Sequence, residues 1–313
     1  MDPNKTIFIL GSGAVGLPLA AYLKNAGRSV VAVQTSKNDV PKTTITVTVH
    51  DRTNRVSTLI ETISLSNLNH LDGILVIATK SYVNKTIALE LKEKGATGPF
   101  VIMQNGVGIE KPFLDAGFSP IARCVLYVTS EAASENSFTF RPIAPSPMGM
   151  VQGTESGLKE YVGYLSTAEF PFRAETNIQR EIWKKAIINT VFNSVCPLLD
   201  VDNGVFARDE EAASLAQQLV RECIMLTSRL NIGLSETEVM QQIMLISKGS
   251  RQRISTLQDI RAGRQTEIEF LNLEIVRLAA ALHPALHLPR IELLGRMILA
   301  KSFEHRSKSS SAN

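Results

Sequence analysis

A glycine-rich hexapeptide near the N-terminus restricts the possible folds of this chain more than any other feature. The run Thr6–Leu10 (T-I-F-I-L) is short, apolar and β-branched, as expected for a strand buried on both faces. It leads directly into G-S-G-A-V-G at 11–16, after which residues 17–26 have the pattern of a helix and residues 29–33 that of a second strand. This order of strand, glycine turn, helix and strand predicts the first βαβ unit of a Rossmann-type domain.

The glycines fit a dinucleotide-binding turn. Gly11 permits the tight turn, Gly13 lets a pyrophosphate approach the backbone, and Gly16 lets the helix pack closely on the strand. The N-terminus of the following helix adds amide donors and the positive end of a dipole. A plain glycine-rich turn is the alternative, but the flanking strand and helix favour a cofactor site. We therefore predict that the cofactor-binding loop consists of Gly11, Ser12, Gly13, Ala14, Val15 and Gly16.

The end of the second predicted strand bears on the choice of dinucleotide. An NAD site usually has Asp or Glu there to hold the ribose 2′-hydroxyl, but this chain has Gln34, Ser36 and Lys37. The absence of an acid, with a lysine to meet a 2′-phosphate, predicts NADP(H). The alternative is that Lys37 is only a solvated loop charge.

Further strands and helices extend the N-terminal half. Residues 43–64 alternate in polarity on both sides of D-R-T-N and predict a hairpin. Buried strands are predicted at 73–78, 100–103 and 121–128, a helix at 83–94, and an irregular sheet edge at 137–150. Ligands gather at the carboxyl ends of such parallel strands, where Lys80 and Asn105 fall.

Beyond residue 175 the pattern is helical, over 176–195, 208–230, 236–248 and onward to about 303. The predicted fold class is an α/β Rossmann-type N-terminal domain followed by an all-α C-terminal domain. We place a dinucleotide-binding domain at 1–175 and an all-helical substrate and catalytic domain at 176–305. The polar tail at 306–313 is predicted to be disordered.

The helix predicted from Thr176 to Cys196, ending before Pro197, carries polar residues on an apolar background. Lys185, Asn189 and Asn193 recur every fourth residue and so lie along one line of its surface, drifting by about 40° per step. Such groups are costly to bury without polar partners. They either hydrogen-bond a neighbouring loop or line a small polar site with Lys185 as its only charge, and this stretch alone does not separate the two. Lys184 points about 100° away and is the natural control.

A second polar segment follows at 255–269. Ser255 with Gln258, and Thr266 with Glu269, have the spacing of capping boxes, and Gly263 has the position of a C-cap. The pattern predicts two helices with a break at 263–265.

Composition excludes several classes of protein. The 313 residues carry a net charge of +3 and 6% aromatic residues, without a basic patch for nucleic acid. No apolar run reaches membrane-spanning length and no signal peptide is apparent. The cysteines Cys124, Cys196 and Cys223 are widely spaced, as expected for reduced thiols of a cytoplasmic protein. His283 and His287 lack a third ligand, so we expect no metal site. From the charge distribution and the short apolar runs we expect no nucleic-acid and no membrane partner.

The chain resembles the ketopantoate reductase family over nearly its whole length. The motifs that carry the resemblance are G-S-G-A-V-G at 11–16, A-T-K at 78–80, Q-N-G-V-G at 104–108, W-K-K-A-I-I-N-T-V-F-N at 183–193, N-G at 203–204 and S-T-L-Q-D-I-R-A-G-R-Q-T-E-I at 255–268. The region 129–150 departs from the family's His-containing, glycine-rich pattern, which leaves the natural 2-oxo acid open.

The resemblance implies an activity and residue roles. The implied reaction is NADPH-dependent reduction of 2-dehydropantoate to pantoate, in pantothenate and coenzyme A biosynthesis, with Lys185 as the catalytic acid at a site between the domains. Substrate contacts are implied for Asn105, Asn189, Asn193, Asn203 and Ser255, and cofactor contacts for Lys80, Asn105, Ala133 and Glu267.

Alternatives stay open at this point. One is an NADP-dependent reductase of another 2-oxo acid or an imine on the same fold. Another is an NADP(H)-binding sensor without chemistry, which the intact Lys185, Asn189 and Asn193 disfavour. The apolar C-terminal helices suit either a homodimer interface or the core of a single chain.

Overall fold

The computed structural model describes residues 5–35, 39–51 and 54–311. The chain forms two compact units. The first comprises residues 1–104 and 108–178, and the second comprises Asn105–Val107 together with residues 179–313. The boundary between the units follows Ile178. The short segment Asn105–Val107 is grouped with the helical part of the chain.

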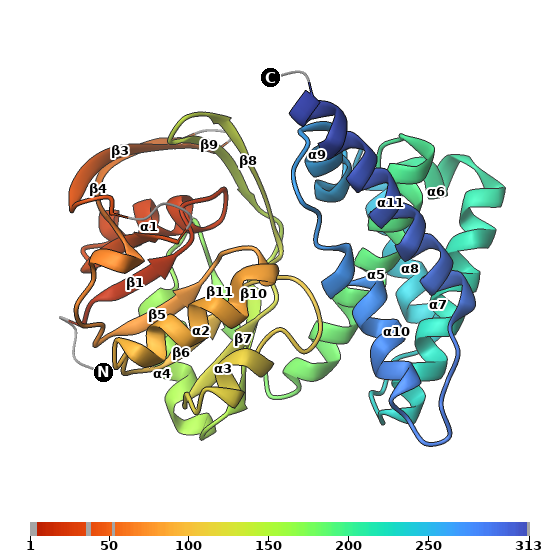
Figure 1. Ribbon diagram of the computed structural model, residues 1–313, viewed down its shortest axis with the longest axis horizontal. Coiled ribbons are helices and arrows are strands. Elements are labelled where there is room, and N and C mark those ends of the chain that lie inside the picture. The colour runs from red at the N-terminus through yellow and green to blue at the C-terminus, as the bar shows by residue number, and fades with distance from the viewer. Residues whose placement is uncertain (1–4, 36–38, 52–53, 312–313) are drawn as a thin grey trace. The chain divides into compact units, whose positions relative to one another are not determined.

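A parallel sheet forms the centre of the first unit (Figure 1). Its strands are β1 (Ile7–Leu10), β2 (Val30–Gln34), β5 (Ile74–Ile77), β6 (Phe100–Ile102) and β7 (Ile121–Cys124). They lie in the order β7-β6-β5-β1-β2, with Ile7 opposite both Val30 and Ile74. Because strands β1, β5, β6 and β7 are wholly buried, they have no polar side for solvent, which explains the continuous apolar sequences of β1, β5 and β6; β7 is the exception, because it contains the buried Arg123.

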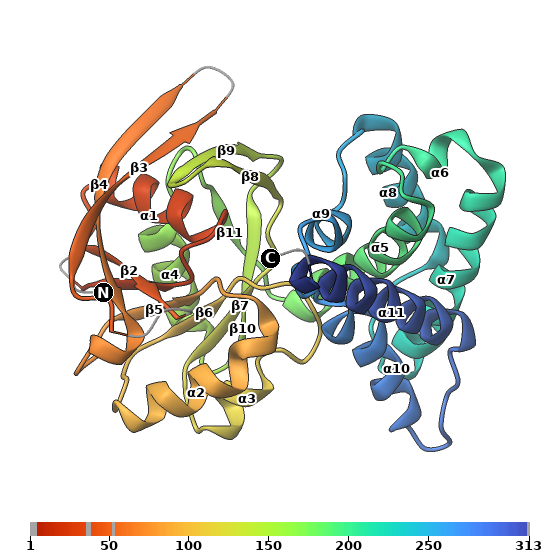
Figure 2. The ribbon, with the colours of Figure 1, turned by 45° about the horizontal axis from the view of Figure 1, so that its top comes forward.

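Six more strands extend the sheet. β3 (Thr43–His50) and β4 (Arg55–Ser64) form the predicted hairpin, and β4 joins β2 in parallel (Figure 2). β9 (Ser137–Pro142) pairs with β3, and β8 (Val128–Ser134) pairs with β9 at that edge. β10 (Ser146–Gln152) and β11 (Phe172–Ala174) complete the other edge. The predicted irregular edge at 137–150 is thus two strands at opposite ends of one sheet.

Helices cover both faces of the sheet. α1 (Gly16–Asn25) and α4 (Leu158–Leu165) share one core with Ile7, Ile9 and other side chains of that face. α2 (Asn84–Glu93) and α3 (Lys111–Asp115) lie on the other face (Figure 1). Short 3₁₀ turns lie at Leu65–Asn67, Ser81–Val83 and Glu155–Gly157.

The second unit is helical. Its helices are α5 (Ile178–Leu199), α6 (Val205–Arg208), α7 (Glu210–Arg229), α8 (Glu236–Gly249), α9 (Ser255–Arg261), the 3₁₀ turn η4 (Ile268–Phe270), α10 (Asn272–Ala280) and α11 (Pro289–Ser311). α11 packs along α10, α7 and α9 (Figure 1). The prediction of a Rossmann-type α/β domain followed by an all-α domain is confirmed. Within the described residues, no helix combines the length and apolarity needed to cross a lipid bilayer.

Several local predictions are wrong. Helix α5 begins at Ile178, after Thr176, and continues through Pro197 to Leu199. Ser255 is the first residue of α9 rather than its cap, and no side chain caps α9 or η4. The break between them is confirmed, since α9 ends at Arg261 and Gly263 has φ +63°.

The tail predicted to be disordered from residue 306 is also helical, as far as the described residues reach. Helix α11 extends to Ser311, and residues 296–311 contain neither a proline nor a glycine to stop it. The Ser307 hydroxyl donates to the carbonyl oxygens of Phe303 and Glu304, so a serine that suggested disorder is accommodated within the helix.

Candidate functional site

The glycine loop between β1 and α1 is shaped by two close backbone contacts. Gly11 has φ +118°, and a Cβ there would lie 2.7 Å from the carbonyl carbon of Ala78 at the end of β5. A Cβ on Gly16 would lie 1.9 Å from the Gly11 carbonyl oxygen. No larger residue fits at either position, because strand and helix backbones meet there.

Gly13 differs from these two glycines. A Cβ at Gly13 would meet no heavy atom within 4 Å among the described residues, its chain neighbours apart. The side of the loop at Gly13 is therefore open, next to the N-terminus of α1 and the positive end of its dipole. An open backbone position beside a helix N-terminus suits a pyrophosphate.

Ser12 adds an unused polar group to this loop. Its Oγ is buried and has no hydrogen-bond partner in the part of the chain that the structure describes. A buried hydroxyl is costly to leave unpaired, so this atom fits a loop that holds a polar ligand. The loop is tied to strand β8 by Ser130, whose hydroxyl donates to the Ala14 carbonyl oxygen. Ala133 lies further along β8 and is exposed.

The carboxyl ends of β5 and β6 carry the next two predicted residues. Lys80 is half-buried and directly precedes the 3₁₀ turn Ser81–Val83. Asn105 is half-buried and begins the segment Asn105–Val107. At the end of β2, Gln34 is half-buried, whereas the predicted cofactor residue Lys37 lies outside the described residues.

Helix α5 places three polar residues one turn apart. Lys185 and Asn189 are half-buried and Asn193 is 2% exposed. The Asn193 amide nitrogen donates to the Asn189 carbonyl oxygen at 2.9 Å. The amide oxygen of Asn193 is buried without a partner among the described residues. The helix therefore presents a lysine and an unfilled amide acceptor on one line.

Further unpaired polar atoms lie in the same unit. Asn203 is 8% exposed, its backbone N–H donates to the Gln252 carbonyl oxygen, and its amide oxygen is buried without a described partner. Thr190 and Asn272 are fully buried, and Thr190 Oγ1 and Asn272 Oδ1 are unpaired within the described ranges. Sequence reasoning missed both, although Thr190 directly follows Asn189. Helical spacing puts it off the line of Lys185, and Asn272 has no sequence signal of its own.

Two predicted residues come from the segment around the break. Ser255 is exposed at the start of α9, and Glu267 is half-buried directly before η4. Lys184, the natural control for Lys185, forms ion pairs with Glu181 at 3.4 Å and Glu238 at 3.6 Å. It is therefore part of a charge network that joins α5 to α8.

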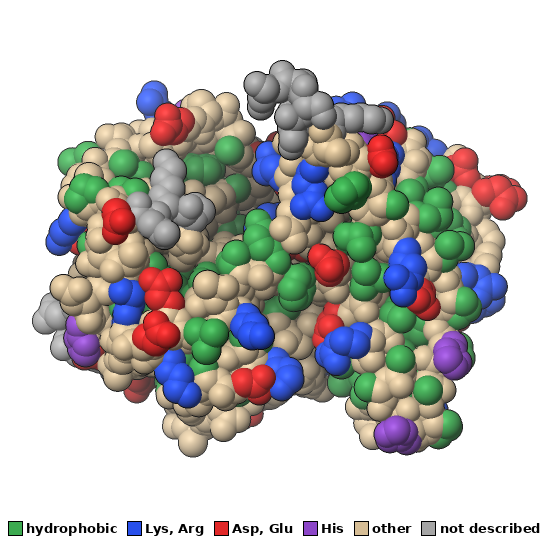
Figure 3. Space-filling model, viewed as in Figure 1, with side chains coloured by type: hydrophobic (Ala, Val, Ile, Leu, Met, Phe, Trp, Pro, Cys, Tyr) green, Lys and Arg blue, Asp and Glu red, His purple; other side chains and the backbone are tan. Residues whose placement is uncertain are grey.

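The predicted residues thus divide between the two units. The glycine loop, Lys80 and Ala133 lie in the first, and the second contains Asn105, Lys185, Asn189, Asn193, Asn203, Ser255 and Glu267. No cluster of three or more His, Cys, Asp or Glu with the geometry of a metal site occurs in the described ranges. On the face shown in Figure 3, basic and acidic side chains are interspersed among apolar ones.

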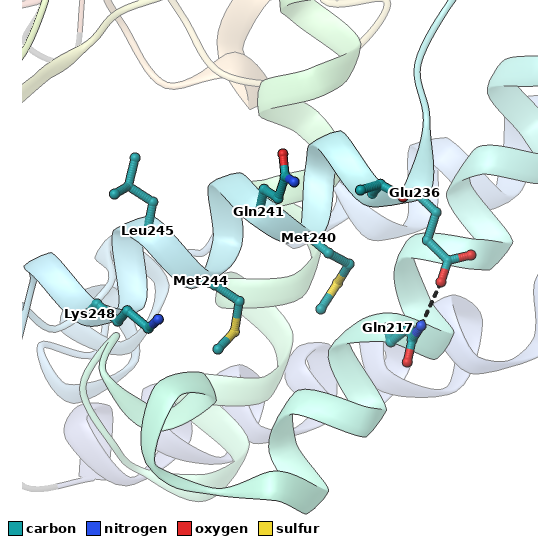
Figure 4. Close-up of a pocket in the computed structure, with 8 residues that line it drawn as sticks. Gln217, Glu236, Met240, Gln241, Met244, Leu245 and Lys248 are labelled. Atoms are coloured by element: carbon teal, nitrogen blue, oxygen red, sulfur yellow. Dashed lines mark hydrogen bonds between the residues drawn. The ribbon is translucent and has the colours of Figure 1, made fainter.

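A cavity of about 540 Å³ lies elsewhere, between α7 and α8 (Figure 4). It is lined by Gln217, Glu236, Thr237, Met240, Gln241, Met244, Leu245 and Lys248. None of these is a predicted site residue, and the Gln217 amide already donates to Glu236 at 2.7 Å.

Two sequence models of one family match the chain. The model described as Ketopantoate reductase PanE/ApbA matches residues 7–143, and the model described as Ketopantoate reductase PanE/ApbA C terminal matches residues 177–302. Together they cover strands β1 to β9 of the sheet and most of the helical unit.

The chain is also similar to proteins named 2-dehydropantoate 2-reductase. The chain is 27% identical over 314 residues to the 2-dehydropantoate 2-reductase of Pyrococcus abyssi, covering 94% of this chain and 97% of that protein. It is 27% identical over 278 residues to the 2-dehydropantoate 2-reductase of Archaeoglobus fulgidus, covering 86% and 89%.

Solved structures share the fold. A D-mandelate dehydrogenase with NADH and anilino(oxo)acetate matches with a TM-score of 0.82 and 19% identity, over 96% of this chain and 99% of that one. A dimeric ketopantoate reductase from Staphylococcus aureus matches with a TM-score of 0.79 and 19% identity, over the same shares. With both halves of the chain matched by its models, this protein is an oxidoreductase that belongs to the ketopantoate reductase family.

Proposed function

We propose that this protein reduces 2-dehydropantoate to pantoate with NADPH, and that Lys185 is the general acid. The observation that carries the proposal is the polar line of α5, where Lys185 and Asn189 precede the buried, unpaired amide oxygen of Asn193. A buried amide acceptor is costly to leave unpaired, and a bound ligand group would remove that cost. The names of the similar archaeal proteins support 2-dehydropantoate as the substrate.

The proposed chemistry assigns separate tasks to the two units. The glycine loop and Lys80 hold the dinucleotide, whose reduced nicotinamide supplies a hydride when bound. Lys185, as an ammonium, polarises the ketone oxygen and then gives it a proton as negative charge develops there. General acid assistance of this kind contributes roughly 10²- to 10⁴-fold to rate.

The asparagines suit the substrate's carboxylate and hydroxyl groups. Their N–H groups donate to an anion, and the open oxygens of Asn193 and Asn203 accept from a hydroxyl. Because amides carry no charge, they do not compete with the substrate for Lys185. In the proposed site Asn105, Asn189 and Ser255 complete these contacts, and Ala133 and Glu267 contact the cofactor.

The preference for NADPH rests on the end of β2. Gln34 stands where an NAD site usually has an acid, and the amide of glutamine does not repel a 2′-phosphate. NADH is the competing cofactor, since the structurally similar D-mandelate dehydrogenase is described with NADH.

A second candidate is the reduction of a different, aryl-substituted 2-oxo acid. The structural likeness to a D-mandelate dehydrogenase complexed with anilino(oxo)acetate favours it. Both candidates use the same hydride and proton transfers and differ only in the group attached to the oxo acid.

Steady-state kinetics separate these proposals. We expect 2-dehydropantoate to show the highest kcat/KM in a panel that includes phenylglyoxylate and branched 2-oxo acids, with NADPH preferred to NADH. A higher kcat/KM for an aryl 2-oxo acid would select the second candidate. NADPH binding without turnover of any panel member would leave only a sensor. The dimeric Staphylococcus aureus relative supports a homodimer, which light scattering on the purified protein tests.

A further inference from the structure

Two buried amide side chains in the first unit bond to each other in both directions. The Asn84 amide nitrogen donates to Gln104 Oε1 at 2.8 Å, and the Gln104 amide nitrogen donates to Asn84 Oδ1 at 2.6 Å. Asn84 is 2% exposed and Gln104 is 6% exposed. Asn84 opens helix α2, whereas Gln104 lies just beyond strand β6, so the pair joins two separate elements.

Each amide uses its second N–H on another segment. Asn84 donates to the Ile109 carbonyl oxygen at 2.9 Å, and Gln104 donates to Thr79 Oγ1 at 3.0 Å. All four N–H bonds and both oxygens of the pair are therefore engaged. A fully satisfied polar network of this kind rigidifies its surroundings.

The contacts made by the pair surround two residues of the proposed site. Gln104 directly precedes Asn105, and Ile109 follows the same loop, so the pair holds both ends of the segment Asn105–Val107. Thr79 directly precedes Lys80, and its backbone nitrogen would lie 2.8 Å from a Cβ on Gly11. The network thus reaches Lys80, the glycine loop and Asn105.

A buried ion pair supports the same strand ends from the next strand. Arg123 of β7 is 2% exposed and pairs with Glu110, and its guanidinium also donates to the Gln104 carbonyl oxygen at 3.4 Å. Glu110 directly follows Ile109. Helix packing alone does not require four polar side chains at this place, because the neighbouring core is apolar.

We propose that the Asn84–Gln104 pair positions Lys80 and Asn105 for cofactor and substrate, an inference that rests on the proposed function. Asn84 and Gln104 are positioning residues, since they act through Thr79 and through the ends of the Asn105–Val107 segment. The two branches are separable. The Thr79 branch serves the dinucleotide, and the Ile109 branch serves the 2-oxo acid.

Three variants of the full-length protein test the inference. Asn84→Ala removes three hydrogen bonds of the network, and Thr79→Val removes only the branch to Gln104. Tyr164→Phe is the matched control. It removes one hydrogen bond, from the Tyr164 hydroxyl to the Lys5 carbonyl oxygen, just before the amino end of β1 rather than at the carboxyl ends.

The expected results are specific to each variant. Asn84→Ala lowers kcat/KM roughly 10- to 100-fold, since displacement of positioning groups by about 1 Å has effects of that size. It also speeds amide hydrogen exchange at residues 105–107. Thr79→Val raises KM for the dinucleotide. It leaves KM for the 2-oxo acid within roughly twofold of the wild-type value, because its branch does not reach the substrate. Tyr164→Phe changes none of these.

The contrary results are equally distinct. Exchange at 105–107 in Asn84→Ala equal to that in Tyr164→Phe would overturn the inference. So would equal rises of both KM values in Thr79→Val, which a general loss of stability produces. If Asn84→Ala does not fold, the comparison of the two KM values in Thr79→Val tests the inference instead. If the wild type reduces no 2-oxo acid, the proposed function fails, while hydrogen exchange and NADPH affinity by fluorescence still decide the inference.

Discussion

The Lys301 ammonium donates a hydrogen bond of 2.6 Å to the carbonyl oxygen of Pro197. Pro197 lies in the last turn of α5, where carbonyl oxygens have no helical donor, and Lys301 comes from α11. Because proline has no N–H, the Asn193 carbonyl oxygen also loses its partner four residues on. The turn that carries Asn193 is thus locally weakened, and a lysine from another helix stabilises its end.

Replacing this lysine tests that stabilisation. We expect Lys301→Met to lower the free energy of unfolding by about 1.5 kcal/mol, the lower end for a hydrogen bond from a charged donor, because the side chain is half-buried. The methionine retains most of the apolar stem, so the loss reports the charge and its hydrogen bond. Urea unfolding measures it, with the exposed Lys248→Met as control. An unfolding midpoint equal to that of the control would show that the contact contributes nothing.

Two glycines of the loop predict opposite phenotypes. Gly16→Ala forces a Cβ to within 1.9 Å of the Gly11 carbonyl oxygen, so we expect a loss of stability of about 1–3 kcal/mol, the range for overpacking. Gly13→Ala meets nothing within 4 Å in the described part of the chain and should fold normally. Its methyl group would occupy the open side of the loop, so we expect at least tenfold weaker NADPH binding, corresponding to about 1.4 kcal/mol.

Thermal unfolding and fluorescence titration of the two variants measure these effects. A Gly13→Ala protein with wild-type NADPH affinity would argue against a pyrophosphate at this position. A Gly16→Ala protein as stable as the wild type would show that helix α1 can move away from β1.

The spacing of apolar residues and the positions of glycine and proline predicted most of the fold, because they depend on local backbone and side-chain preferences. Strands such as β1 and β5 are continuous apolar runs, and the hairpin alternates on both sides of its turn. The wrong predictions concern helix ends whose positions depend on contacts between residues distant in sequence. Pro197 stays within α5, and Lys301, distant in sequence, supplies a donor to that turn. Polar residues near 306 stay helical because α11 has already been nucleated upstream.

The proposed site could be predicted from the sequence only in part, for the same reason. Lys185, Asn189 and Asn193 could be proposed because all three lie on one helix at a regular spacing. Asn84 and Gln104 escaped notice because their partners come from other segments, and neither has a local pattern. The ion pair of Lys184 with Glu238 could not be predicted, because Glu238 lies on α8, more than fifty residues away in sequence.

The turn that contains Asn203 predicts a pH dependence. The hydrogen bond from Arg208 and that from the Gly204 backbone N–H hold the pKa of Asp202 below its usual range. Since the folded pKa is lower than the unfolded value of about 3.9, Asp202 stabilises the fold above about pH 4. That contribution is lost as the pH falls through the folded pKa.

Urea unfolding of Asp202→Asn against wild type between pH 6 and pH 3 measures this contribution. We expect a difference in unfolding free energy at pH 6 that shrinks toward pH 3, because the wild-type carboxyl becomes protonated. A control is Asp115→Asn, which breaks an exposed ion pair with Lys111 and should have little effect. A difference for Asp202→Asn that stays constant over this range would show that charge at Asp202 is irrelevant.

The neighbouring lysines of α5 provide the sharpest test of the proposed chemistry. Lys185→Met removes the proposed proton donor while keeping a stem of similar length, so we expect kcat for the 2-oxo acid to fall roughly 10²- to 10⁴-fold. NADPH affinity should stay unchanged, because the dinucleotide loop belongs to the first unit. Lys184→Met breaks the ion pairs with the buried Glu181 and the partly exposed Glu238, so it should lower stability and leave kcat intact. Circular dichroism confirms folding of both variants, and single-turnover NADPH oxidation measures the chemical step. A folded Lys185→Met protein with near-wild-type turnover would require another acid.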